Sequence, residues 1–62
     1  MTYYVVTMGY LWDMQTAEEK DEFFSYAEAV SYIQDRGAIK DKSDIDLWLG
    51  CSEWYKITKI TR

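Results

Sequence analysis

The most reactive side chain in the sequence is the thiol of Cys51, the only cysteine in a chain that contains no histidine. A nucleophilic thiol needs a neighbouring base or a helix N-terminus to lower its pKa, whereas Cys51 follows Gly50 in what reads as a turn. A single thiol without imidazoles forms neither an intrachain disulfide nor a typical zinc site. Because histidine, the usual general acid or base, is missing, we expect a protein that is not an enzyme and holds no metal.

The segment from Asp41 to Asp46 places oxygen ligands at alternating positions, as the start of a calcium-binding loop does. Such a loop requires glycine at its sixth position and glutamate at its twelfth, where this chain has Asp46 and Ser52. The three glycines are isolated from one another, so no phosphate-binding loop is recognisable. We interpret the segment as a solvated loop and expect no cofactor.

Acidic side chains are concentrated in residues 13–22, which hold five acids and one lysine. The rest of the chain balances six acids with six bases, so this segment carries the whole net charge of −4. An acidic surface with aromatic anchors beside it favours docking on a basic surface, such as the groove of a nucleic-acid-binding enzyme. A solvated loop that aids solubility is the alternative. The predicted partner-binding residues of this segment and its flank are Tyr10, Trp12, Met14, Glu18, Glu19, Asp21 and Glu22.

Aromatic residues make up 18% of the chain and include three tryptophans. A domain of 62 residues has few fully enclosed positions, so we expect at least one tryptophan at an interface. Trp48 and Trp54 flank the predicted turn at Gly50. We place Trp48 among the predicted partner-binding residues, and a position in the core is the alternative reading for it.

The acidic balance, with a sequence pI near 4.5, argues against direct binding to nucleic acid or to an anionic membrane surface. Apolar runs are only a few residues long, so no segment is expected to span a bilayer. The N-terminal residues lack the basic and apolar regions of a signal peptide. A free cysteine without an export signal suits the cytoplasm, which would be the host cytoplasm for a phage-encoded protein.

The elements that must position these residues begin with a predicted strand over residues 3–14, which are rich in β-branched and aromatic side chains. Its even-numbered positions form one continuous apolar face, and Gly9 within the run indicates a bulge or bend. We expect residues 15–18 to connect this strand to a second one at 19–24. The two strands would form a hairpin with an acidic tip.

Ser25 and Glu28 have the spacing of a capping box, which predicts a helix from about residue 26 to 36. Gly37 is a natural residue to follow the last turn of that helix. Residues 38–44 are predicted to be a charged loop. Residues 45–49 favour a short strand over a helical turn, and residues 53–61 have strong β character.

We therefore expect one α+β domain over residues 1–62. It would contain a small antiparallel sheet of three to four strands, in the order β-β-α-β-β, with one helix packed on one face. Both long strands carry apolar residues on both faces, so the sheet face without a helix would expose aromatic surface. A second copy of the chain could cover it, and we expect a homodimer.

Residues 23–33, Phe-Phe-Ser-Tyr-Ala-Glu-Ala-Val-Ser-Tyr-Ile, are followed at 54–60 by Trp-Tyr-Lys-Ile-Thr-Lys-Ile. This pattern is similar to that of many short ββαβ proteins from phages and mobile elements. Such small acidic proteins often inhibit or redirect a host protein, and several anti-defence and anti-CRISPR proteins share this size and charge. The resemblance implies an inhibitor of a host defence protein that acts through its acidic hairpin and exposed aromatic face.

Two other function classes remain open at the level of the sequence. The first is a dimer that sequesters a nucleotide or another small ligand between aromatic rings. The second is a structural subunit of a larger assembly. For a nucleotide, the phosphates would need nearby basic side chains, for which the candidates are Lys40, Lys42, Lys56, Lys59 and Arg62.

Overall fold

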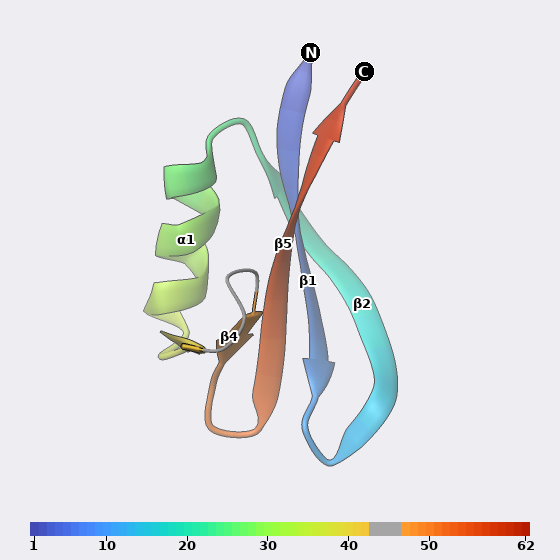
Figure 1. The fold of residues 1–62 in the computed structure, drawn as a ribbon, viewed down its shortest axis with the longest axis vertical. Helices are drawn as coiled ribbons and strands as arrows, with labels where there is room; N and C mark the ends of the chain where they lie inside the picture. The colour runs from blue at the N-terminus through green and yellow to red at the C-terminus, as the bar shows by residue number, and fades with distance from the viewer. Residues whose placement is uncertain (43–46) are drawn as a thin grey trace.

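The chain builds one antiparallel sheet with a helix on one face. The computed structural model describes residues 1–42 and 47–62. Its elements are β1 (Thr2–Tyr10), β2 (Asp13–Phe23), α1 (Tyr26–Asp35), β3 (Ile39–Lys40), β4 (Leu47–Leu49) and β5 (Glu53–Thr61). The sheet has five strands in the order β2-β1-β5-β4-β3, and all neighbouring pairs run antiparallel (Figure 1). The α+β class, the antiparallel sheet and the single helix on one face are confirmed.

The first hairpin turns earlier than the sequence predicts. β1 ends at Tyr10, the turn falls on residues 11–12, and β2 begins at Asp13. The predicted strand over 3–14 and the predicted connection over 15–18 are therefore wrong in their bounds, because residues 15–18 lie within β2. The acidic residues consequently lie along a strand, and the tip of the hairpin is apolar and aromatic.

Polar side chains that bind backbone groups explain why the turn lies where it does. The Thr16 hydroxyl accepts a hydrogen bond from the Tyr10 amide at 2.8 Å and donates to the Asp13 carbonyl at 2.7 Å. The Asp13 carboxylate accepts from the Gln15 amide at 3.1 Å. Local side-chain bonds of this kind compete with a continuing strand ladder. They outweigh the β-propensity of the residues around the turn.

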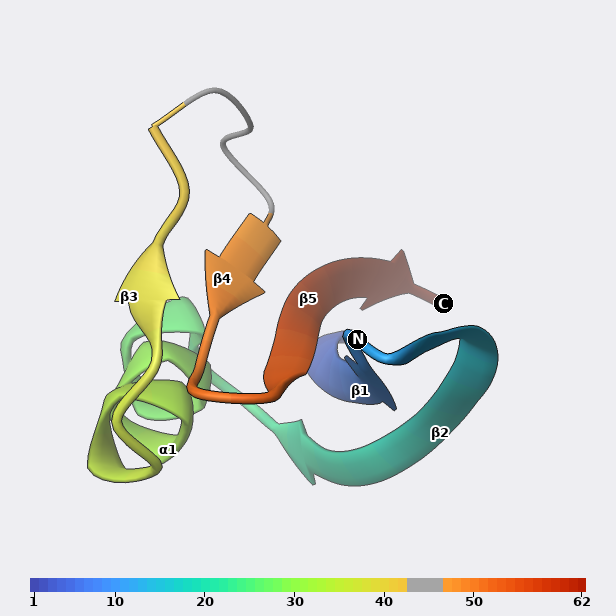
Figure 2. The ribbon, with the colours of Figure 1, turned by 90° about the horizontal axis from the view of Figure 1, so that it is seen from below.

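Gly9 lets the hairpin curl over the sheet face that α1 leaves uncovered. A Cβ atom at Gly9 would collide with the Thr16 carbonyl oxygen and would lie 2.5 Å from the indole ring of Trp54. The register between β1 and β2 shifts between Met8 and Tyr10, which confirms the bulge expected at this glycine. Figure 2 shows β2 as a wide arc beside β1.

The helix α1 follows its sequence signals closely. Ser25 is the N-cap, and its hydroxyl accepts a hydrogen bond from the Glu28 amide at 3.1 Å. At the other end, Gly37 adopts a φ of +82°. Its amide donates to the Gln34 carbonyl, and the Ala38 amide donates to the Ile33 carbonyl at 3.4 Å. This pair of bonds is a Schellman motif, so the helix ends one residue before its predicted limit.

We predict that Ser25→Ala lowers the free energy of unfolding by about 1 kcal/mol, because it removes the acceptor for the Glu28 amide. Urea denaturation followed by circular dichroism measures this loss. Ser31→Ala is a matched control, because Ser31 is exposed in the middle of the same helix. An equal loss in both variants would contradict a capping role for Ser25.

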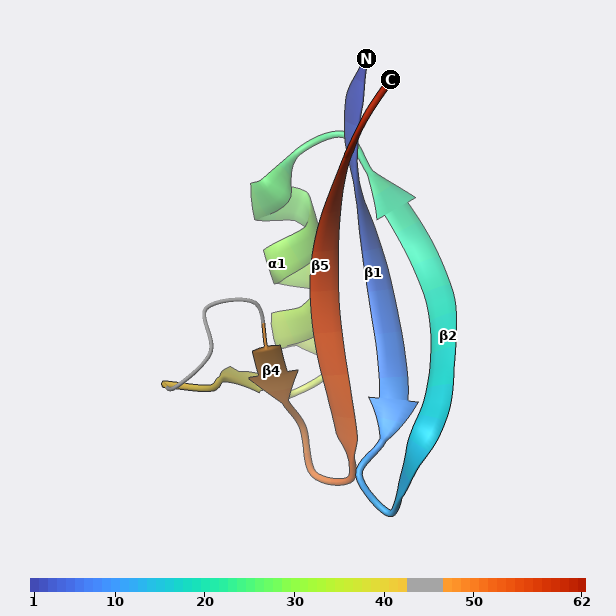
Figure 3. The ribbon, with the colours of Figure 1, turned by 45° about the vertical axis from the view of Figure 1, so that its right-hand side comes forward.

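The core lies between α1 and one face of the sheet, with the other face turned away from the helix (Figure 3). Trp48 belongs to this core and is only 6% exposed. Its predicted place among the partner-binding residues is therefore corrected to its alternative, a position in the core. The pairing of Trp48 with Tyr55 and of Tyr55 with Met8 puts these side chains on the helix side. The buried cluster contains Val6, Met8, Ala29, Ile33, Ala38, Trp48, Tyr55 and Ile57.

The second half of the chain contains one more strand than the sequence predicts. Ile39 and Lys40 form β3 inside the predicted loop over 38–44, so the order is β-β-α-β-β-β. They pair with Leu49 and Trp48 of β4. This two-residue strand exists because of that pairing, and the β-propensity of its residues alone does not predict it. The strand predicted over 45–49 is confirmed for its last three residues. Residues 43–46 lie outside the described residues.

Candidate protein-docking site

The tip of the β1–β2 hairpin presents a stacked pair of aromatic rings. Tyr10 is the last residue of β1 and Trp12 lies in the turn. Their ring centroids are 5.1 Å apart and their planes are inclined by 21°. Trp12 is 74% exposed, although tryptophan is usually well buried. The hairpin thus holds a large apolar ring in solvent in a defined orientation.

The acidic residues extend from this tip along β2. Glu18, Glu19, Asp21 and Glu22 are all exposed. Glu19 pairs with Thr7 and Glu22 with Val5, on the sheet face away from the helix, whereas Glu18 and Asp21 pair with residues of the core face. Carboxylates therefore project on both faces of this strand. The expected acidic hairpin is present, with its charge along the strand rather than at the tip.

Lys20 is the one base in this acidic stretch, and it neutralises little of it. Its Nζ atom forms an ion pair with Glu18 at 3.0 Å. The hydrogen bond to this carboxylate raises the pKa of Lys20. Exposed ion pairs of this kind contribute little to stability, so this pair does not fix the conformation of the strand. The other three acids, Glu19, Asp21 and Glu22, are exposed and therefore accessible to a partner.

β2 is an edge strand, with β1 as its only strand neighbour among the described residues. Its 11 residues are long for an edge, which exposes unpaired backbone groups. Negative side chains and bulges are the usual means by which proteins keep such an edge from pairing with other chains. The same charges favour approach to a basic surface.

The structure thus brings together Tyr10, Trp12 and the four acids on one hairpin, and separates Trp48 from them. Met14 belongs to β2, but its side chain is outside the part of the chain that the structure describes. Sequence reasoning missed Leu11, which lies between Tyr10 and Trp12 in the chain and is 39% exposed. Its position in a turn, rather than in a strand, is the signal that would have identified it.

The sheet face away from α1 is partly covered by the chain itself. Val5 on this face is only 6% exposed, and the hairpin curls over Trp54. An apolar cavity of about 260 Å³ remains there. It is lined by Leu11, Leu47, Leu49, Trp54 and Lys56. The fully open aromatic face expected from the sequence is therefore reduced to this hollow.

The ionisable groups of the described residues form no arrangement typical of a metal or thiol site. Within residues 1–42 and 47–62 there is no group of three or more potential metal ligands. Cys51 is exposed in the turn between β4 and β5. Among the described residues, the pKa that departs most from its usual value is that of Tyr55. Burial and a hydrogen bond to Glu53 at 2.5 Å raise this pKa to about 12. The Tyr55 side chain belongs to the core cluster, and its hydroxyl donates to a half-buried carboxylate.

The raised pKa of Tyr55 predicts a loss of stability at alkaline pH. The folded protein holds the Tyr55 proton more tightly than the unfolded chain, whose tyrosine titrates near 10.0. The unfolded chain therefore ionises first, and the free energy of unfolding falls as the pH rises from 10 towards 12. Urea denaturation on either side of pH 10 should show a shallower fall for Tyr55→Phe than for the wild type. Parallel falls in the two proteins would contradict this assignment.

No helix among the described residues combines the length and the hydropathy needed to cross a membrane. No protein-family profile, curated protein or solved structure matches the chain. The functional argument therefore depends on the geometry of the hairpin and on the charges along it.

Proposed function

We propose that the protein is a non-catalytic binding module that docks its β1–β2 hairpin on the basic surface of a partner protein and blocks that surface. The observation that carries this proposal is the exposed Tyr10–Trp12 stack at the end of an acidic edge strand. The biological setting we favour is inhibition of a host defence protein by a protein of phage or mobile-element type. That setting is supported by the resemblance in size and charge.

The two parts of the hairpin would contribute differently to binding. Trp12 offers a large apolar ring, and its stacking on Tyr10 limits the motion that would be lost on docking. The acids of β2 create a negative field that accelerates encounter with a basic surface. Affinity would therefore depend mainly on the aromatic tip, and the association rate mainly on the strand.

The proposal is tested by comparative capture from an extract of the native cell. We expect the wild-type protein to retain a partner that is lost when Glu19→Lys and Glu22→Lys are combined, since both acids are exposed on β2. The matched control combines Glu28→Lys and Asp35→Lys, which change the net charge equally on exposed positions of α1. The control should retain the same partner.

Raising the salt concentration should weaken capture by the wild type, because exposed charges are screened over about 10 Å at 0.1 M salt. If the β2 variant and the α1 control lose the partner equally, the hairpin is not the docking site. If the two variants and the wild type all retain it unchanged, the acidic strand has no role in binding.

A further inference from the structure

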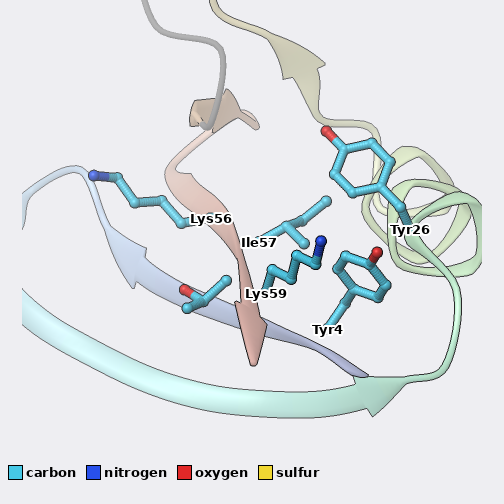
Figure 4. Close-up of a pocket in the computed structure, with 6 residues that line it drawn as sticks. Tyr4, Tyr26, Lys56, Ile57 and Lys59 are labelled. Carbon is cyan, nitrogen blue, oxygen red and sulfur yellow. The ribbon is translucent and has the colours of Figure 1, made fainter. Parts of the chain in front are cut away.

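A groove lies between the start of α1 and the second half of β5, far along the sheet from the hairpin tip. Its volume is about 550 Å³. Tyr4 and Tyr26 form its aromatic wall, with ring centroids 5.8 Å apart and planes at 76°. Figure 4 shows these two rings facing Ile57 and Lys59 of β5. The lining residues are Tyr4, Tyr26, Lys56, Ile57, Thr58 and Lys59.

The backbone at this groove is a strand edge. On one side, β5 pairs with β1 along its whole length, as far as Thr61. On the other side it pairs with β4 only from Trp54 to Lys56. Among the residues that the structure describes, the stretch from Ile57 to Thr61 has no strand on that side. An edge of this kind accepts an added strand through main-chain hydrogen bonds.

The groove has the opposite charge to the hairpin. Lys59 pairs with Tyr4 in the register, so both side chains lie on the helix side, and Figure 4 shows the Lys59 amine beside the tyrosine rings. Lys56 projects from the other side of β5 and adds a second positive charge near Ile57, where the pairing with β4 ends among the described residues. No acidic residue is among the described residues that line the groove. Its chemistry suits carboxylates next to apolar atoms.

We propose that this groove binds an extended acidic segment of a partner protein, which adds a strand beside α1 to the edge of β5 from Ile57 to Thr61, where the described residues provide no strand neighbour. In such a pairing, residues opposite Ile57 and Lys59 share the helix side, so the segment would place an apolar side chain and a carboxylate two positions apart. The protein would then hold two docking surfaces of opposite charge, the acidic hairpin and this basic groove.

The test uses fluorescence anisotropy with a labelled, end-blocked peptide that repeats glutamate, threonine, valine and threonine, so that glutamate and valine alternate on one face of the strand. We expect it to bind the full chain, and a peptide in which lysine replaces each glutamate to fail. A version of the acidic peptide methylated on alternate backbone nitrogens should also fail, because strand addition needs these donors. Hydrogen exchange should slow at the amides of residues 57–61 when the acidic peptide is bound.

Lys59→Glu should weaken binding of the acidic peptide about tenfold or more, because it removes a charge-assisted hydrogen bond and adds repulsion. Lys40→Glu makes the same charge change on an exposed residue of β3 and should bind as the wild type does. Tyr26→Ala should also weaken binding, and it keeps a good helix former at the first position of α1.

Three results would overturn the proposal. The first is equal affinity of the acidic and basic peptides, and the second is binding of the methylated peptide as tightly as the unmodified one. Alternatively, a nucleoside triphosphate could bind at Lys59 and Tyr26 while the acidic peptide does not, which would identify a small-ligand site instead. Trp12→Ala should leave peptide binding unchanged, so this test is independent of the hairpin proposal.

Discussion

Gly9→Ala should lower the free energy of unfolding by about 1–3 kcal/mol, the range for forcing extra atoms into a well-packed site. The added Cβ would collide with the Thr16 carbonyl oxygen and would lie 2.5 Å from the indole ring of Trp54. The oxygen belongs to the backbone, so it cannot move without a shift of β2, and the rigid indole ring would also have to be displaced. For a domain of this size, such a loss is a large share of the total stability.

Two other glycines provide matched controls for this substitution. Gly50→Ala should change stability by less than about 0.5 kcal/mol, since its Cβ would lie 3.6 Å from the nearest atom and its φ is not positive. A Cβ atom at Gly37 would have no atom within 4 Å, but the φ of this residue is +82°. Gly37→Ala should therefore lower the free energy of unfolding by about 1 kcal/mol through backbone strain alone. Urea denaturation followed by tryptophan fluorescence ranks the three. If Gly9→Ala were as stable as Gly50→Ala, the hairpin would not curl as described.

Trp12→Ala should reduce affinity for the captured partner about 30-fold or more, since truncation of an aromatic hot spot costs about 2 kcal/mol or more. The same substitution should change the free energy of unfolding by less than about 0.5 kcal/mol, because the ring makes few contacts with the folded chain. Trp12→Phe should recover part of the affinity, because it keeps a ring that can stack on Tyr10. Isothermal titration calorimetry with the purified partner measures all three proteins.

Phe24 is the matched control for this loss of an exposed aromatic ring. It is 75% exposed, against 74% for Trp12, but it lies between β2 and α1 instead of at the hairpin tip. Phe24→Ala should therefore bind the partner as the wild type does. Equal losses in the two variants would indicate a general effect of surface hydrophobicity and would contradict the assignment of the site to the hairpin.

The helix was predictable because its signals are local. Ser25, Glu28 and Gly37 each act on backbone groups within one turn, and the observed helix differs from the predicted one by a single residue. The predicted position of the first hairpin turn was wrong. Asp13 was assigned to the first strand and Thr16 to the connection, whereas their side chains form hydrogen bonds with backbone groups that fix the turn. Charge and aromatic composition nevertheless identified the hairpin itself.

Features that depend on strand order could not be predicted. Trp48 is buried because β4 lies beside β5, and no local pattern distinguishes it from an exposed tryptophan. The groove likewise needs Tyr4, Tyr26 and Lys59, which come from the two ends and the middle of the chain and meet only through the β1–β5 register. Both lysines of this groove, Lys56 and Lys59, were candidates in the sequence for binding a phosphate, but their tyrosine neighbours were not recognised as part of a site.

The most direct test of the central claim is site-specific photo-crosslinking from the tip of the hairpin in the native cell extract. We replace Trp12 with benzoylphenylalanine, which keeps an aromatic side chain, and use the same substitution at Gln34, an exposed residue of α1, as the control. We predict adducts from position 12 that map to a basic surface of one partner protein, with none of these adducts from position 34. Adducts from position 34 alone, or the same adducts from both positions, would contradict docking through the hairpin.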